Sequence, residues 1–261
     1  MQSVLKNPLA SPFTLGVSSG ASLGAGLAII SGLTVLPAGL AAVPAAGFAA
    51  SVLTIAFLLR FSRAIDPRLE GNTVILAGMV LSLFLNAALT LFSALSKEGM
   101  NRLLFWQMGS FALKGTGPLV CVACVTLVAT AAIYRYRREL DILTFGDDEA
   151  VSLGVPAGRA RAALIILASV MTGTVVSFVG VIGFLDLAVP HVARKAFGPA
   201  HRVLIPLSAL LGGSLMVLAD LLARVLIPPL DLPVGAITAI LGTPFFAHVY
   251  LSSGRRDQCG L

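Results

Sequence analysis

Apolar segments of about 20 residues, separated by short polar stretches, recur along the whole chain. An α-helix needs about 20 mostly apolar residues to cross the hydrocarbon core of a bilayer. Only 11% of the 261 residues are charged and 57% are hydrophobic, whereas soluble domains carry roughly a quarter charged residues. The pattern therefore predicts an all-α, polytopic membrane helix bundle, and no polar stretch is long enough to form a soluble domain.

Charges and turn-forming residues divide the apolar sequence into eight expected membrane spans. These spans cover residues 15–35, 39–60, 72–96, 115–134, 161–180, 183–196, 203–226 and 234–252. The sixth span is short and is separated from the fifth by Gly180 and Gly183. Because glycine lacks a Cβ, a tight reversal of the chain at this point is sterically cheap.

The distribution of Lys and Arg orients the expected spans. With Lys6 in the cytoplasm, alternation of the spans leaves only four of the 18 basic residues at or near the outer face, and these are Lys97, Arg102, Lys114 and Arg224. This asymmetry follows the positive-inside rule. The net charge of +6 is therefore attributed to basic residues retained in the cytoplasm rather than to nucleic-acid binding, and both ends of this chain are expected on the cytoplasmic side.

Small residues are concentrated near the start of the chain. Gly16, Gly20 and Gly24 recur at a spacing of four residues and share one helix face. Membrane helices associate through close backbone packing at Gly, Ala and Ser, so the spacing favours a tightly packed helix interface. The alternative is that this face of small residues lines a wide substrate path.

Several short motifs follow one another in a fixed order. They are "NPLASPFTLGVSSGASLG" at 7–24, "LAGMVLS" at 76–82, "FWQMGSF" at 105–111, "GDDEAVSLGV" at 146–155, "VIGFLDLAVPHVAR" at 181–194, "HRVLIPLSALLGGSLMVLADLLAR" at 201–224 and "LPVGAITAILGTPFF" at 232–246. In this order and spacing the chain resembles the FecCD family of ABC transporter permeases, which import iron–siderophore, haem and cobalamin. The resemblance extends over essentially the whole chain.

The resemblance implies a single transmembrane permease domain over residues 1–261. Permeases of the family have ten transmembrane helices, so the eight expected spans imply that the first helix and nearly all of the second are missing here. The implied partners are a second permease copy, two ABC ATPase subunits, a periplasmic or lipoprotein substrate-binding protein and the lipid bilayer, with no nucleic acid. The chain has no P-loop sequence and is expected to bind no cofactor or metal, because the partner ATPase would use the ATP and Mg²⁺.

The largest expected cytoplasmic loop spans residues 141–160 and carries the acidic run Asp147, Asp148 and Glu149. The resemblance implies that this segment forms short coupling helices that dock on the ATPase subunit. The residues expected to couple are Gly146, Glu149, Ala150, Leu153 and Gly154. Considered without the resemblance, the charge run would favour an ordinary solvated loop.

Two further segments are expected at the inner end of the transport path. The resemblance assigns a cytoplasmic gate to Asn7 and Leu9, in the Asn-Pro-Leu-Ala turn, and to Asn72 and Thr73, at the start of the third expected span. The alternative for both segments is that Asn-Pro and Gly-Asn are simply turn formers.

Charges inside apolar spans are functional candidates by default. Asp220 and Arg224 have the favourable i, i+4 order for a helical ion pair, so we expect a structural pair there. Asp186 occupies a position where relatives usually carry a small residue. It is a candidate for lining the pathway and meeting a cationic or metal-bearing group, and the alternative is a pair with a neighbouring helix.

The leading hypothesis is an ATP-driven importer of iron(III)–siderophore or a related chelate, in which this chain is the membrane-spanning subunit and is not itself an enzyme. An alternative is a secondary carrier driven by an ion gradient, but such carriers usually show paired intramembrane acids or broken helices in corresponding halves. A second alternative is a non-transporting fragment, because missing helices would leave packing faces open to lipid.

Overall fold

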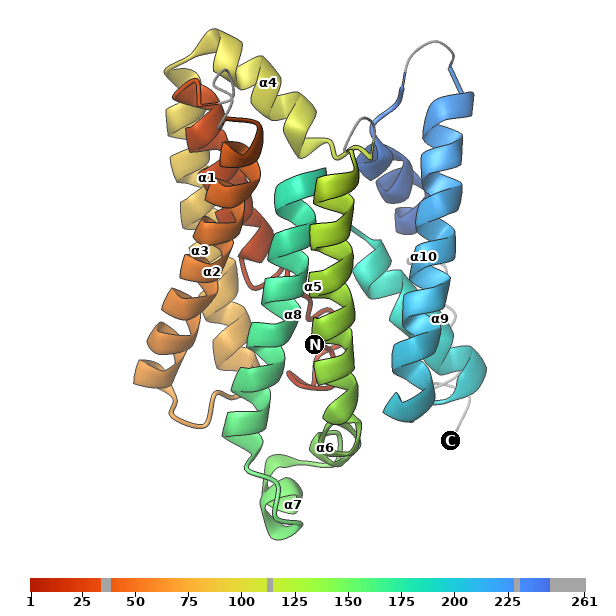
Figure 1. The fold of residues 1–261 in the computed structure, drawn as a ribbon. Coiled ribbons are helices and arrows are strands. Elements are labelled where there is room, and N and C mark those ends of the chain that lie inside the picture. Colours follow the sequence, from red (N-terminus) through yellow and green to blue (C-terminus); the bar gives the residue numbers. More distant parts are fainter. Residues whose placement is uncertain (34–38, 112–114, 228–230, 245–261) are drawn as a thin grey trace. The chain divides into compact units, whose positions relative to one another are not determined.

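The computed structural model describes residues 1–33, 39–111, 115–227 and 231–244. The chain divides into two compact units, unit 1 (Met1–Val181) and unit 2 (Ile182–Leu261), and each is described by itself (Figure 1). All regular secondary structure in the described residues is helical. The all-α fold expected from the sequence is therefore confirmed, whereas the single permease domain stays a prediction.

Unit 1 contains eight helices within the described residues. They are α1 (Val17–Ile30), α2 (Gly39–Ile65), α3 (Gly71–Ala94), α4 (Lys97–Gln107), α5 (Thr116–Arg135), α6 (Arg137–Leu143), α7 (Asp147–Ser152) and α8 (Ala157–Val179). Unit 2 contains α9 (Leu185–Phe197), α10 (His201–Val225) and a further helix at Val234–Pro244.

Five of the described helices are long and apolar enough to cross a membrane. They are α3, α5, α8, α10 and the Ala42–Ile65 part of α2. Each of the eight expected spans contains a helix, but α1, α9 and the Val234–Pro244 helix are shorter than a full span. The last expected span, 234–252, lies partly outside the described residues.

The expected break between the fifth and sixth spans is present. Helix α8 ends at Val179 and α9 begins at Leu185, so residues 161–196 are not one helix. Gly180 has a left-handed φ of +85°, and a Cβ there would overlap the carbonyl of Trp106. The amide of Ser110 donates to the carbonyl of Val179 (2.8 Å), which fastens the end of α8 to the segment that follows α4.

Helix α1 lies at the centre of unit 1, in contact with α2, α3, α4 and α8. Its small residues face these neighbours at very short range. A Cβ at Gly20 would overlap the side chain of Thr54, and a Cβ at Gly24 would overlap the carbonyl of Ala46, both on α2. The close-packing interpretation of the glycine spacing is therefore confirmed, because only glycine allows the two backbones to approach this closely.

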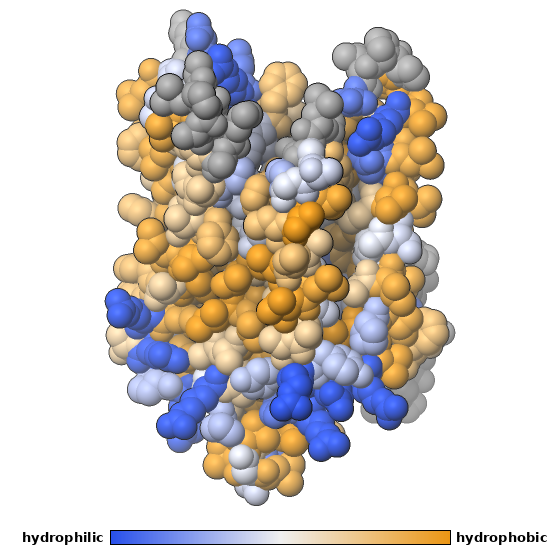
Figure 2. Space-filling view, viewed as in Figure 1, coloured by the Kyte–Doolittle hydropathy of each residue, from blue (hydrophilic) through white to orange (hydrophobic). Residues whose placement is uncertain are grey.

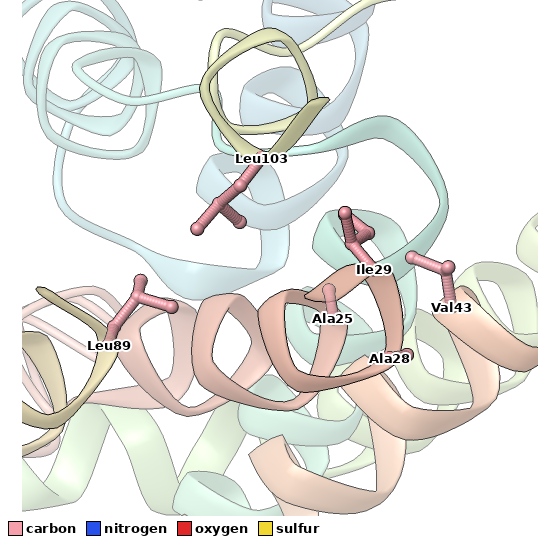
Figure 3. Packing of buried hydrophobic residues seen from close by; sticks show 6 residues of the cluster. All are labelled: Ala25, Ala28, Ile29, Val43, Leu89 and Leu103. Carbon is pink, nitrogen blue, oxygen red and sulfur yellow. The ribbon is translucent and has the colours of Figure 1, made fainter. Parts of the chain in front are cut away.

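One end of unit 1 is held by an apolar group that we call the Leu103 cluster. Its buried members are Ala25, Ala28, Ile29, Val43, Leu89 and Leu103. Figure 3 shows Leu89 of α3 and Leu103 of α4 beside the α1 turns that carry Ala25 and Ala28. Trp106 packs against the same cluster. Helix α4 can begin here because the Ser96 side chain accepts a hydrogen bond from the amide of Gly99 (3.1 Å), which caps its first turn.

The opposite end of unit 1, which we call the basic end, gathers positive charge. It contains the N-terminal segment 1–10, the loop between α2 and α3, and helices α6 and α7. The arginines of this end are Arg60, Arg63, Arg68, Arg135, Arg137, Arg138, Arg159 and Arg161. Figure 2 shows hydrophilic side chains around this end and a hydrophobic surface on the tip formed by α6 and α7.

Candidate functional site

Arg161, in the first turns of α8, is the largest fully buried side chain of the described residues and is 1% exposed. Its Nε donates to the carbonyl of Val4 (3.0 Å). Its Nη1 donates to the carbonyls of Arg68 and Leu69 (3.0 Å each). One guanidinium therefore joins α8 to the N-terminal segment and to the α2–α3 loop, using the rigid set of donors that distinguishes arginine from lysine.

The same guanidinium also holds α7. Its Nη2 donates to both carboxylate oxygens of Asp147, the first residue of α7, at 2.8 and 2.9 Å. Lys6 reaches Asp147 from the N-terminal segment, with its Nζ 2.8 Å from Oδ1. We call these three side chains, together with the carbonyls of Val4, Arg68 and Leu69, the Arg161 cluster.

Opposing effects act on the carboxyl group of Asp147. Burial would raise its pKa, but the hydrogen bonds and positive charges of Arg161 and Lys6 outweigh burial and hold the pKa below its ordinary 3.8. Asp147 is therefore ionised at neutral pH, and the buried guanidinium has a charged partner. A buried charge without such a partner is strongly unfavourable.

The backbone is strained where it enters the Arg161 cluster. Lys6 (φ 48°) and Leu69 (φ 55°) are two of only three non-glycine residues with positive φ in the described chain. Such conformations cost about 1–3 kcal/mol each and persist only where surrounding contacts enforce them. The Lys6–Asp147 pair and the Arg161 bond to the Leu69 carbonyl supply such contacts.

The two predicted gate segments lie together at the basic end. A Cβ at Gly71 would overlap the carbonyl of Leu5, so the start of α3 packs directly on the N-terminal segment. Asn72 is exposed at this start, and Thr73 is half-buried beside it. The structure thus brings these two residues and the Asn-Pro turn into one region, although the gate itself stays a prediction.

The Asn-Pro turn has a local explanation as well. The side chain of Asn7 accepts a hydrogen bond from the amide of Leu9 (2.8 Å), which is the turn-forming behaviour expected of Asn. Leu9 itself is exposed. Turn formation and a role in gating are compatible, because the turn is what presents Leu9 at the surface of the basic end.

The predicted coupling residues surround α7. Gly146 precedes the helix, and the carboxylate of Glu149 lies against it, so a side chain at Gly146 would require this carboxylate to move. Ala150 is fully buried, whereas Leu153 and Gly154 are exposed. Gly154 ends this turn with a left-handed φ of +79°.

The exposed surface of the α6–α7 tip is unusually apolar for a polar end of the molecule. Phe145, Val151 and Leu153 are 77%, 64% and 66% exposed. Exposed apolar side chains that gather in one place mark interaction sites. The tip therefore presents an apolar surface beside the acidic residues of α7.

Unit 2 contains the charged residues that the sequence analysis singled out within apolar spans. Arg224 Nε is 3.0 Å from Asp220 Oδ2, at the expected i, i+4 spacing on α10. Asp186 lies in the first turn of α9. Helices α9 and α10 and the Val234–Pro244 helix enclose an apolar cavity of about 420 Å³, whose lining includes Leu185 and Val189 but not Asp186. The pathway role of Asp186 stays a prediction.

Sequence reasoning missed the central residues of the Arg161 cluster. Arg161 and Lys6 were recognised only as cytoplasmic charges, and Asp147 only as part of an acidic run. Their contacts join residues up to 157 positions apart, which no local pattern specifies. One usable signal existed, because Arg161 is the last charged residue before a long apolar run, where a charge must find partners or snorkel to the interface.

Comparison with known proteins places this architecture. The model of the FecCD transport family matches residues 1–252. The ABC transporter permease protein YvrB of Bacillus subtilis is 39% identical over 254 residues, which are 97% of this chain and 72% of YvrB. The Fe(3+) dicitrate transport system permease protein FecD of Escherichia coli is 36% identical over 248 residues, which are 94% of this chain and 75% of FecD.

The likeness extends to three dimensions. A solved structure described as an inward-facing conformation of a metal-chelate type ABC transporter is 29% identical to this chain, with a TM-score of 0.85. The match covers 96% of this chain and 79% of that chain. The sequence motifs, the helix order and the fold thus agree, and the chain belongs to the FecCD transport family.

Proposed function

We propose that this chain is the membrane-spanning subunit of an ATP-driven importer that carries an iron(III)–siderophore or a related chelate across the cytoplasmic membrane. The observation that carries the proposal is the α6–α7 tip, where an apolar surface is exposed at the charged end of unit 1. These apolar side chains do not pack within unit 1. An ATPase subunit that docks below the membrane would cover them.

The tip is suited to receive movement from a partner. Ala150 anchors α7 against unit 1, and Val151 and Leu153 face outward. An interface with a few apolar side chains at its centre and charged residues at its rim has the composition of a specific docking site. ATP-driven closure of two ATPase subunits would displace α7 as a rigid body, and the bundle would alternate between outward and inward access.

The orientation follows from charge. Because eight of the nine arginines of unit 1 lie at the basic end, with Arg102 of α4 as the exception, that end is expected to face the cytoplasm under the positive-inside rule. This orientation supports ATPase docking at α7 and substrate delivery by a binding protein at the opposite face. Two permease copies would surround one central path.

The substrate class rests on similarity alone. FecD is named for Fe(3+) dicitrate, and the solved relative is described as a metal-chelate transporter. These names support an iron chelate as cargo, with haem and cobalamin as the other classes implied by the family.

The docking role can be tested with Leu153→Asp. Burying a leucine is worth about 1.5–3 kcal/mol, so loss of this contact should weaken ATPase binding by at least about tenfold. The measurement is the amount of ATPase subunit that co-purifies with tagged permease from its native membranes in mild detergent. The matched control is Leu95→Asp at the opposite end of unit 1, where the leucine is also largely exposed (79%, against 66% for Leu153).

The expected result is loss of co-purification for Leu153→Asp but not for Leu95→Asp, with both proteins at normal abundance in the membrane. Equal recovery of ATPase with all three proteins would show that α7 is not the docking site. If the wild-type permease brings down no ATPase, the importer proposal fails, and uptake driven by an ion gradient becomes the experiment to perform.

A further inference from the structure

We propose that the Arg161 cluster links α7 to the two gate segments, so that Arg161, Asp147 and Lys6 are positioning residues that couple ATP-driven movement to opening of the transport path. The inference rests on the proposed function and deepens it. The family assignment explains neither why an arginine is fully buried at the polar end of α8 nor why it binds three other segments.

Helix α7 is attached to the rest of unit 1 through Ala150 and Asp147. Ala150 is the one residue of α7 that is buried. The strongest polar attachment lies at the first residue of the helix, where Asp147 accepts two hydrogen bonds from Arg161 and pairs with Lys6. A displacement of α7 therefore acts on Arg161 and Lys6 directly.

Arg161 and Lys6 in turn connect to the two gate segments. Lys6 is the residue before the gate residue Asn7. The Leu69 carbonyl, which accepts from Arg161, lies three residues before the gate residue Asn72. Each gate segment thus has a residue that lies within three positions of a member of the Arg161 cluster. The two gate segments also contact each other, at Gly71 and Leu5.

Two features of the Arg161 cluster would allow the link to open and close. Lys6 and Leu69 are held at positive φ, a conformation that non-glycine residues leave when their contacts are released. The Lys6–Asp147 pair is partly exposed, whereas the Arg161 guanidinium is buried. Breaking the outer pair while the buried anchor holds would give the cluster a second arrangement, and a coupling element requires two.

A purely structural role makes a different prediction. If the cluster only stabilised the fold, weakening it would lower abundance and thermal stability, and the molecules that remained would import normally for each ATP hydrolysed. A coupling role predicts that, whatever the loss of stability, the assembled complexes hydrolyse ATP but import less for each ATP.

The experiment compares four variants of the full permease reconstituted in liposomes with its ATPase subunits and binding protein. Asp147→Asn removes the charge that both cations bind, and Lys6→Met removes only the outer pair. Lys6→Arg keeps the positive charge and should behave as wild type. Arg63→Gln is the matched control, because Arg63 is an exposed cation of the same end that lies outside the cluster.

The main readout is the amount of substrate imported per ATP hydrolysed, with radiolabelled ferric citrate, haemin and cobalamin as probes. Coupling free energies between sites typically correspond to effects of about 5-fold or more, so Asp147→Asn should lower this ratio at least about fivefold, and Lys6→Met less. ATPase co-purification and basal ATP hydrolysis should persist in both.

A second readout follows the gate directly and needs no substrate. Spin labels at Leu9 and Asn72, in a chain whose cysteines are replaced by serine, report the separation of the two gate segments with and without bound nucleotide. The wild-type protein should show a nucleotide-dependent change in this distance. In Asp147→Asn and Lys6→Met the change should shrink, while Arg63→Gln should retain it.

Unchanged import per ATP and an unchanged distance response in Asp147→Asn would overturn the link. If Asp147→Asn fails to reach the membrane, Lys6→Met decides between the two roles in the same way. An equal loss of coupling in Arg63→Gln and Lys6→Met would also overturn it, because the effect would then follow from charge alone. Failure of the proposed function is distinct, since the wild-type complex itself would then show no ATP-driven import.

Discussion

The two ends of unit 1 are held together by opposite means. At the basic end, one buried guanidinium joins α8 to three other segments through directional bonds of 2.8–3.0 Å. At the other end, the Leu103 cluster joins α1, α2, α3 and α4 through contacts among Ala, Ile, Val and Leu (Figure 3). Apolar packing is non-directional, so it weakens gradually as helices shift.

Hydrogen bonds of the kind made by Arg161 behave differently, because they fail within a short displacement or a modest change of angle. Unit 1 therefore has one end suited to remain assembled and one end suited to switch. The end that can switch is also the end that carries α7 and the two predicted gate segments.

The largest effect is expected from Arg161→Met, which should lower the free energy of unfolding by about 3–5 kcal/mol, because it breaks a buried ion pair and leaves backbone carbonyls without a donor. Arg159→Met is the matched control, since Arg159 lies two residues earlier and is exposed. The measurement is denaturant unfolding of the purified protein in detergent. Equal stability of the two variants would show that the Arg161 contacts contribute little.

A smaller loss is expected where α1 meets α2. In Gly24→Ala the new Cβ would overlap the carbonyl of Ala46, so the helices must separate, at a cost of about 1–3 kcal/mol. Gly117→Ala is the control, because Gly117 lies in α5 with open space beside it. Thermal unfolding in detergent compares the two. If Gly24→Ala is as stable as Gly117→Ala, the packing of α1 against α2 is looser than the structure indicates.

The third effect is similar in size to the second, depends on pH and belongs to the basic end alone. Because the pKa of Asp147 is lower in the folded protein than its ordinary 3.8, its stabilisation is complete above pH 3.8 and is lost as the pH falls through the folded pKa. At pH 7, Asp147→Asn should cost about 2 kcal/mol, the range of a charged hydrogen bond. The measurement is the free energy of unfolding of the wild type and of Asp147→Asn from about pH 7 to about pH 3. The difference between the two proteins should shrink only below pH 3.8, and a constant difference would contradict the assigned charge state of Asp147.

Much of the fold follows from short-range patterns. Apolar length predicts the helices, and the four-residue spacing of Gly20 and Gly24 predicts a tightly packed helix interface. The structure shows that the partner in this interface is α2. The i, i+4 order of Asp220 and Arg224 likewise anticipates the pair on α10. Each of these features depends on residues within a single segment of the chain, so it can be predicted from the sequence alone.

The candidate site is different, because its contacts are not local. Arg161 differs locally from Arg159 only in being the last charge before a long apolar run, and its partners are set only when folding places the carbonyls of Val4 and Leu69 beside it. The exposure of Val151 likewise has no local signal, because valine is usually a buried residue. For Leu153 an exposed position is implied only by the resemblance, through its expected role in docking. Tertiary context determines both features.

The separation between Val4 and Arg161 also sets an order of events during biosynthesis. Because 157 positions lie between them and ribosomes add about 5–20 residues per second, the acceptor at Val4 waits on the order of 10 s for its donor to be made. The Leu103 cluster needs nothing beyond α4 and is complete much earlier. The Arg161 contacts can therefore form only after the first turns of α8 have been made, and they need the first segment to be in place to receive the guanidinium.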